Sequence, residues 1–128
     1  MSQENLLYSE SHEWIKDNGD GTVTIGITDH AQDSLGDIVF VELPDLGDSF
    51  EIEDEFGVVE SVKAASDLYM PVAGSIVATN SELEDEPEII NEDPYDKGWM
   101  IKVKLADAGD LDKLLNLEQY QEVVDAEA

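Results

Sequence analysis

The decisive stretch of this sequence is Glu60-Ser61-Val62-Lys63-Ala64-Ala65-Ser66-Asp67. It lies between two apolar runs, at residues 56–61 and 68–70, whose composition is typical of strands, so we predict a hairpin with Lys63 at its tip. The side chains next to Lys63 are small and uncharged, and a lysine amine on its flexible stem is a natural attachment point for a longer arm. From spacing alone, however, an unmodified lysine in a solvated turn is the commoner case.

The overall composition indicates one globular domain. The chain has 128 residues, of which 41% are hydrophobic, so we expect a single domain over residues 1–128. It has no Cys, which excludes disulfides and thiolate metal sites, and it has no apolar run long enough to span a membrane. Residues Met1–Asn5 lack the pattern of a secretory signal, so we expect a cytoplasmic protein.

Acidic side chains dominate the charge of the chain. There are 32 acidic and only six basic residues, all of them Lys, and the formal net charge is −26. This charge argues against nucleic acids and anionic membranes as partners, and it would steer the chain towards enzymes with basic docking surfaces. Solubility or adaptation to a salty medium is the alternative explanation, and the sequence does not decide between them.

Short strands separated by Gly and Pro turns account for most of the chain. We expect strands at residues 13–17, 22–27, 37–43, 56–61, 68–70, 74–78 and 99–105. In the last of these, alternation places Trp99 on the same face as Ile101 and Val103. A mainly-β sandwich or flattened barrel follows from this pattern.

Helices are expected as additions to the sheets. Residues 28–36 predict a short helix, because Thr28 can cap it and Gly36 can end it. Residues 81–92 predict a helical turn or two, and the end of the chain predicts C-terminal helices that pack on the sheet. The C-terminal apolar stripes are Leu111, Leu114 and Leu115, followed by Leu117, Tyr120 and Val124.

A short internal echo relates two parts of the chain. Pro44–Phe50 and Pro71–Val77 carry Pro and Gly at the same offsets, and both end on an apolar residue. The echo is consistent with two similar halves about a pseudo-twofold axis, with Lys63 at the turn between them.

The chain lacks the residues for independent catalysis. Its only histidines, His12 and His30, have no paired metal-ligand spacing, and there is no nucleophile elbow or Gly-rich phosphate loop. Carboxylates are so abundant that no pair of them stands out. One attachment point without a self-contained active site predicts a carrier whose reactive atoms belong to a cofactor, and not an enzyme.

Several motifs in order along nearly the whole chain point to one family. They are Ser11–Trp14, Gly26–Gln32, Leu35–Pro44, Val59–Asp67, Asn91–Tyr95 and Gly98–Met100. Together they resemble the glycine cleavage H-protein family, the lipoyl carriers of the glycine cleavage system. The resemblance implies the lipoyl-domain-like barrel-sandwich hybrid fold and lipoate in amide linkage on Lys63, as N6-lipoyllysine.

The resemblance also implies a pathway and partners. In the family, the carrier takes an aminomethyl group from the glycine decarboxylase, a pyridoxal-phosphate enzyme, to the aminomethyltransferase during glycine degradation. A dihydrolipoyl dehydrogenase then reoxidises the arm, and lipoate-attaching enzymes load it. We expect this chain to meet the same partners as a monomer.

Three positions match the family's cleft for the loaded arm, namely Ser11, Glu13 and Asp67. A primary amine is cationic at neutral pH, so a carboxylate would hold it by charge-assisted hydrogen bonds. The alternative is that Ser11 and Glu13 merely open a strand and that Asp67 supports the turn.

Other readings of the carrier lysine remain open. Biotin carriers usually have Met on both sides of the lysine, where this chain has Val62 and Ala64. Lipoyl domains of larger complexes usually have Pro/Ala linkers, which are absent here. An H-like lipoyl carrier that passes lipoate to other proteins is the nearest alternative function. An acidic interaction module with unmodified Lys63 is a third.

Overall fold

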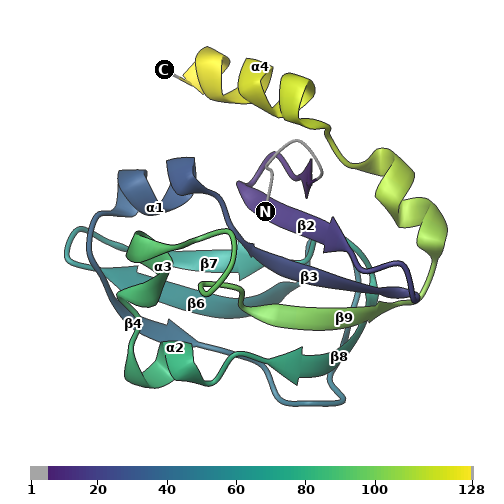
Figure 1. Cartoon of the computed structure of the whole chain (residues 1–128), viewed down its shortest axis with the longest axis horizontal. Coiled ribbons are helices and arrows are strands. Elements are labelled where there is room, and N and C mark those ends of the chain that lie inside the picture. The colour runs from purple at the N-terminus through teal and green to yellow at the C-terminus, as the bar shows by residue number, and fades with distance from the viewer. Residues whose placement is uncertain (1–5, 128) are drawn as a thin grey trace.

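The computed structural model describes residues 6–127 as two antiparallel sheets that face each other (Figure 1). The larger sheet has the order β1 (Leu7–Tyr8), β2 (Glu13–Asp17), β3 (Thr22–Ile27), β9 (Ile101–Leu105), β8 (Gly74–Thr79) and β5 (Ser49–Phe50). The smaller sheet has the order β4 (Ile38–Glu42), β6 (Glu55–Ser61) and β7 (Ala65–Tyr69). The mainly-β prediction is confirmed, whereas the expectation about Met1–Asn5 concerns residues outside the described range.

Local turn chemistry explains the first hairpin, whose strands β2 and β3 have the predicted bounds. The turn Asn18–Gly21 places Gly19 and Gly21 at φ 83° and 89°, in the left-handed region that favours glycine. The two strands then pair in register, with Ile15 opposite Ile25.

Strands β7, β1 and β5 differ from the sequence prediction, and so does the start of β9. β7 begins at Ala65 and not at Leu68, because its pairing with β6 extends back to the Ala65–Glu60 pair. β1 and β5 are only two residues long, too short for an alternation pattern. β5 pairs with β8, with Ser49 opposite Ser75, so the two echo segments lie against each other as antiparallel strands.

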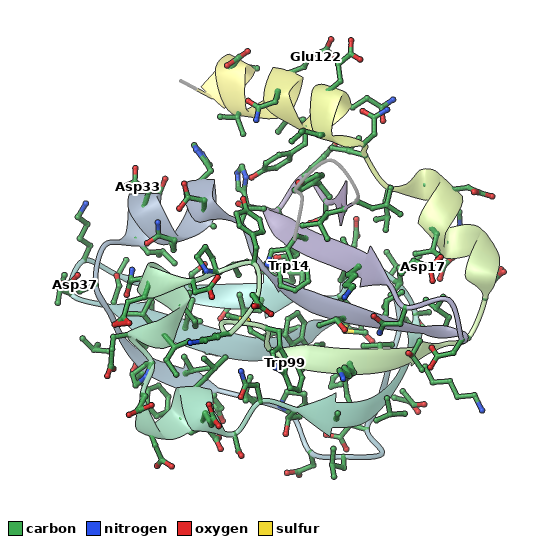
Figure 2. All side chains as sticks on the ribbon, in the orientation of Figure 1. Trp14, Asp17, Asp33, Asp37, Trp99 and Glu122 are labelled. Atoms are coloured by element: carbon green, nitrogen blue, oxygen red, sulfur yellow. The ribbon has the colours of Figure 1, made fainter. Side chains whose placement is uncertain are left out.

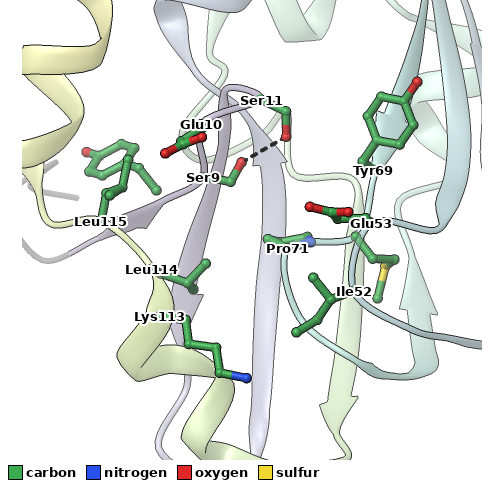
Figure 3. Close-up of a pocket in the computed structure, with 12 residues that line it drawn as sticks. Ser9, Glu10, Ser11, Ile52, Glu53, Tyr69, Pro71, Lys113, Leu114 and Leu115 are labelled. Atoms are coloured by element: carbon green, nitrogen blue, oxygen red, sulfur yellow. Dashed lines mark hydrogen bonds between the residues drawn. The ribbon is translucent and has the colours of Figure 1, made fainter.

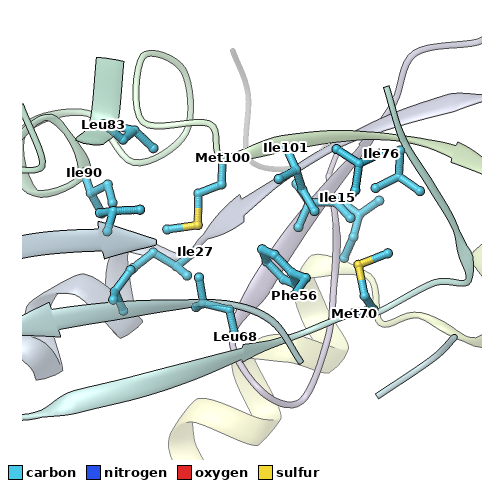
Figure 4. Packing of buried hydrophobic residues seen from close by; sticks show 14 of the residues in the cluster. Ile15, Ile27, Phe56, Leu68, Met70, Ile76, Leu83, Ile90, Met100 and Ile101 are labelled. Atoms are coloured by element: carbon cyan, nitrogen blue, oxygen red, sulfur yellow. The ribbon is translucent and has the colours of Figure 1, made fainter. Parts of the chain in front are cut away.

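One apolar layer fills the space between the two sheets (Figure 4). Ile25 and Ile101 enter it from the larger sheet, and Val59 and Leu68 enter it from the smaller one, all at most 3% exposed. Burying each such side chain contributes about 1.5–3 kcal/mol, so the layer fixes which face of each strand points outward.

A second cluster lies on the outer side of the larger sheet, around Trp14. The Trp14 ring covers Gly26, where an added Cβ would lie 2.7 Å from the ring, and its Nε1–H donates to the Pro94 carbonyl at 2.8 Å. Trp99 packs against this cluster, which corrects the prediction that it shares a face with Ile101. The reason is that β9 begins only at Ile101, so Trp99 is outside the strand's alternation.

The helices close the ends of the sandwich. Helix α1 (Asp29–Leu35) is the predicted one: the Thr28 hydroxyl accepts from the Ala31 N–H, and Gly36 ends it at φ 81°. The predicted helical turns are α2 (Glu82–Asp85) and α3 (Ile89–Glu92), each with one buried anchor, Leu83 and Ile90 respectively.

The C-terminal region consists of a 3₁₀ helix (Ala108–Lys113) and helix α4 (Leu117–Glu127). The three leucines of the first predicted apolar stripe do not pack together. Leu111 and Leu114 contact the main core, whereas Leu115 contacts the second cluster. Within residues 6–127, no helix has the length and apolar content needed to cross a membrane.

Tyr120 joins α4 to the N-terminal segment. Its hydroxyl shares hydrogen bonds of 2.7 Å with His12 Nδ1 and with the Thr28 hydroxyl, and its ring stacks on Tyr8 at 4.6 Å. Tyr120 is 3% exposed, so these bonds form in a desolvated setting where they position α4.

We expect Tyr120→Phe to lower the free energy of unfolding by about 1–2 kcal/mol, because the two buried hydrogen bonds are lost while the ring stacking remains. Urea unfolding measures the change. Tyr69→Phe is the matched control, since Tyr69 is 40% exposed. Equal stability of the two variants would contradict a structural role for the Tyr120 hydroxyl.

Candidate functional site

Lys63 lies at the exposed tip of the β6–β7 hairpin, as the sequence predicts. The Ser61 hydroxyl accepts from the backbone N–H groups of Lys63 and Ala64, both at 3.1 Å. The Ser61 N–H in turn donates to the Ala64 carbonyl at 2.8 Å. The N–H groups of Ser61, Lys63 and Ala64 and the Ala64 carbonyl therefore all have hydrogen-bond partners within the turn. The tip is thus held in one conformation, and the Lys63 side chain points to solvent.

The tip is also bound to the body of the protein. The Val62 N–H donates to the Asp37 carbonyl at 3.0 Å, which joins the tip to the segment before β4. Lys63 Cε lies 3.3 Å from the position a Gly36 Cβ would occupy, so the lysine stem packs closely against this glycine, whose φ of 81° is in the left-handed region. Asn91 fixes Gly36 by donating to its carbonyl at 2.8 Å.

Asn91 is the central polar residue beneath the hairpin tip. Besides its bond to Gly36, its Nδ2 donates to Gln32 Oε1 at 2.9 Å, and its Oδ1 accepts from the Ile38 N–H at 2.8 Å. One side chain on α3 thus holds the end of α1 and the start of β4 in place. The base of Lys63 is therefore fixed by contacts among four segments.

Glu13 is the buried carboxyl group of the candidate cleft, 2% exposed at the start of β2. Its Oε1 accepts from the Ser9 hydroxyl at 2.6 Å and from the Ser11 hydroxyl at 2.5 Å. The backbone N–H of Tyr69, on β7, also donates to this carboxylate. The side chain therefore links the N-terminal turn to the hairpin strand that follows Lys63.

Burial raises the pKa of Glu13 from 4.5 to about 7, although the hydrogen bonds from Ser11, Ser9 and Tyr69 act in the opposite direction. The carboxyl group therefore changes its charge near neutral pH. A cation brought close to it would favour the ionised form and expel the proton.

A cavity of about 580 Å³ adjoins this carboxyl group (Figure 3). It is lined by Tyr8, Ser9, Glu10, Ser11, Ile52, Glu53, Tyr69, Met70, Pro71, Lys113, Leu114 and Leu115. The hydroxyls of Ser9 and Ser11 are 3.3 Å apart at its wall. Glu13 is not part of the lining, but both serines that hold its carboxylate are.

Asp67 has a different environment from Ser11 and Glu13. It lies exposed on β7, and its charge, with a hydrogen bond, raises the pKa of the neighbouring Glu55. The structure thus brings Ser11 and Glu13 into contact and places Asp67 next to Glu55, outside the cavity lining. Asp67 is four residues from Lys63, at most about 14 Å along extended chain.

Sequence reasoning missed three groups that build the site: Ser9, the Tyr69 backbone N–H and Asn91. Ser9 could have been suspected, because it precedes Ser11 by two residues and has the same chemistry. The other two act across the fold, and no local pattern indicates them.

Two facing sheets with an exposed lysine at a tied hairpin tip are the architecture of a lipoyl-type carrier domain, the barrel-sandwich hybrid. Comparison with known proteins identifies the family within this class of carrier domains. The family described as Glycine cleavage H-protein matches residues 6–127, and the chain belongs to this family. The membership inferred from the sequence motifs is thereby confirmed.

Individual relatives agree with this assignment. The chain is 60% identical over 123 residues to the glycine cleavage system H protein of Chromohalobacter salexigens, covering 96% of this chain and 94% of the relative. It is 57% identical to that of Vibrio parahaemolyticus, covering 95% and 97%. The crystal structure of the Mycobacterium marinum H protein superposes with a TM-score of 0.87 at 37% identity, covering 95% and 98%.

The raised pKa of Glu13 predicts a specific dependence of stability on pH. Between pH 4.5 and about 7 the folded protein binds this proton more tightly than the unfolded chain does, so the Glu13 contribution to stability falls as pH rises. We expect Glu13→Gln to become more stable relative to the parent by about 2–3 kcal/mol between pH 4.5 and pH 8.

Urea unfolding at several pH values measures this relative gain. Glu10→Gln, on the neighbouring exposed residue, is the charge-matched control. A difference between Glu13→Gln and the parent that stays constant with pH would show that burial does not raise this pKa.

Proposed function

We propose that this chain is the lipoyl-carrying shuttle of a glycine cleavage system, with lipoate attached to Lys63. In this role it carries the aminomethyl group from a glycine decarboxylase to an aminomethyltransferase during glycine degradation. The observation that carries the proposal is the exposed Lys63 at a fixed hairpin tip in a member of the H-protein family. Members of this family are carriers and not catalysts.

The surroundings of Lys63 fit an attached lipoyl group. Lys63 is exposed, and it forms no ion pair within 4 Å with a carboxylate among the described residues, so its amine is open to an attaching enzyme. Val62 is 67% exposed and Ala64 is small, so neither blocks the approach. Bound lipoate would supply a disulfide that accepts the aminomethyl group. The protein supplies a fixed origin for the arm.

The polar side chains of Ser11, Glu13 and Asp67 suit a cationic cargo. The aminomethyl amine is protonated at neutral pH, and Glu13 with Ser11 would accept its N–H donors beside the cavity. Glu13 is buried, so the amine would replace a serine hydroxyl as donor and favour the ionised carboxylate. Asp67 would attract the same cation before it reaches Glu13, because Asp67 is exposed and follows Lys63 by only four residues.

The proposal extends to partners and location. The partners would be the glycine decarboxylase, the aminomethyltransferase, a dihydrolipoyl dehydrogenase and lipoate-attaching enzymes, met by a monomer in the cytoplasm. Nucleic acids and membranes are not among them, because the net charge of −26 repels phosphates. Tethering the cargo keeps it at a high effective concentration for each enzyme in turn.

We expect Lys63→Arg to abolish lipoylation and all glycine cleavage activity in a reconstituted system containing the partner enzymes. Arg keeps the positive charge but does not form the amide. Intact mass detects the adduct, and Lys97→Arg is the control that keeps both lipoate and activity. Lipoate found on Lys63→Arg would contradict the attachment site. A fully lipoylated parent that supports no glycine cleavage would instead favour a role in lipoate transfer to other proteins.

We expect Glu13→Ala to accelerate the loss of ammonia from the aminomethyl-loaded carrier about tenfold to a hundredfold, while lipoylation is unchanged. The estimate corresponds to losing a charge-assisted hydrogen bond worth about 1.5–3 kcal/mol. The lifetime of the isolated loaded carrier is measured by ammonia release, with Glu10→Ala as the control. An unchanged lifetime would exclude Glu13 from holding the cargo.

A further inference from the structure

Three of the six lysines lie on the outward face of the larger sheet. We call Lys16, Lys102 and Lys104 the lysine face. Lys16 and Lys102 are both opposite Thr24, one on each neighbouring strand, and Lys104 follows two residues along β9. The alternation imposed by Ile15, Ile101 and the rest of the core turns all three away from the interior.

Carboxylates are absent from the outward strand positions around the lysine face. In β2, β3, β8 and β9 these positions are held by Trp, Lys, Thr, Gly, Ser, Val and Ala. The smaller sheet has the opposite pattern, because Glu42, Glu55, Glu60 and Asp67 lie exposed on it. In a chain with 32 acidic residues, the outward strand positions therefore carry lysines on the larger sheet and carboxylates on the smaller one.

The lysines of this face are not neutralised by the protein itself. Among the described residues, none of the three has a carboxylate oxygen within 4 Å of its ammonium group. Asp20 lies at the border, in the turn before β3, where hydrogen bonds from Thr22 lower its pKa and the charge of Lys102 adds to this effect. Asp96 is the other bordering carboxylate, in the wall of a small cavity next to Lys16 and Lys102.

That cavity has a volume of about 220 Å³ and makes the surface beside Lys16 and Lys102 concave. The Lys102 ammonium lies 5.3 Å from the centroid of the Trp99 ring, a cation–π distance that keeps the charge in place over an apolar surface. Trp99 lies in the middle of the sheet in Figure 2, while Asp37, beside the Lys63 hairpin, lies at one end of the molecule.

We propose that the lysine face binds an acidic surface of a partner protein and leaves the Lys63 hairpin free. The spacings suit protein carboxylates: Lys102 and Lys104 are about 7 Å apart along β9, and Lys16 and Lys102 are about 10 Å apart across two strand spacings. The net charge of −26 disfavours nucleic acid. The contact does not require lipoate on Lys63.

This contact has an unusual dependence on salt. At about 0.01 M salt the Debye length is about 30 Å, so the whole negative chain repels an acidic partner. At about 0.15 M it is about 8 Å, and only the nearby lysines act. At about 1 M the lysines are screened as well. Binding is therefore strongest at intermediate ionic strength, whereas contact with a basic partner weakens steadily as salt is added.

The experiment is an NMR titration of the full-length lipoylated protein with poly-L-glutamate, from 0.01 to 1 M NaCl. We expect shifts in the amides of β2, β3 and β9, largest near 0.15 M. Lys102→Glu/Lys104→Glu should weaken binding about threefold to thirtyfold or more. Lys97→Glu/Ser81→Glu/Ala126→Glu, at exposed positions outside the lysine face, is the control with the same change of net charge, and it should bind like the parent.

Each other outcome overturns the proposal. Equal loss of binding in the lysine-face variant and in the control variant would mean that net charge and not the lysine face is responsible. Saturation by inorganic phosphate at the same amides would make the occupant a small anion. Concentration-dependent self-association that is lost only in Lys102→Glu/Lys104→Glu would make it a second copy. Unchanged melting temperatures confirm that both variants fold, and glycine cleavage assays with the partner enzymes test the proposed function separately.

Discussion

The constraint on which this structure depends is the shared apolar layer between two small sheets. Ile25, Ile101, Val59 and Leu68 reach it only if every strand keeps its alternation, since a slip of one residue would turn the whole strand over. The same alternation determines which side chains lie on the outer faces of the two sheets. It turns Lys16 and Lys102 to one outer face and Asp67 to the other, and it leaves the hairpin tip beyond the ends of the sheets. The chemistry of the surface is therefore a consequence of how the interior is filled.

Glu13 is the most deeply buried carboxyl group among the described residues, 2% exposed against 4% for Asp110. Burying it is unfavourable, and the hydrogen bonds from Ser9, Ser11 and the Tyr69 N–H offset only part of that cost, because the pKa is still raised to about 7. A buried carboxyl group whose ionised form is disfavoured without a cation, and favoured with one, is suited to reversible capture. The proposed cargo amine is such a cation.

Much of the fold could be predicted from the sequence, because its signals are local. Gly19 and Gly21 define a turn, Thr28 and Gly36 define a helix, and small residues around Lys63 define an accessible tip. Trp99 was misplaced because alternation says nothing about where a strand begins. The site was predicted in part: Ser11 and Glu13 do contact each other, but whether they hold cargo remains a proposal. Asn91 and the Tyr69 N–H could not be found, since each meets its partners only after distant segments have packed.

The tied hairpin tip affects the fraction of loaded arms that would be captured near Glu13 at any moment. The bonds from Val62 to Asp37 and from Asn91 to Gly36 keep the base of Lys63 at a constant place relative to Glu13. Capture of the proposed cargo is then a ring closure within one molecule, whose entropic cost depends on the length of the arm. Diluting the protein would leave the captured fraction unchanged. A carrier built in this way would protect its cargo equally well when it is scarce and when it is abundant.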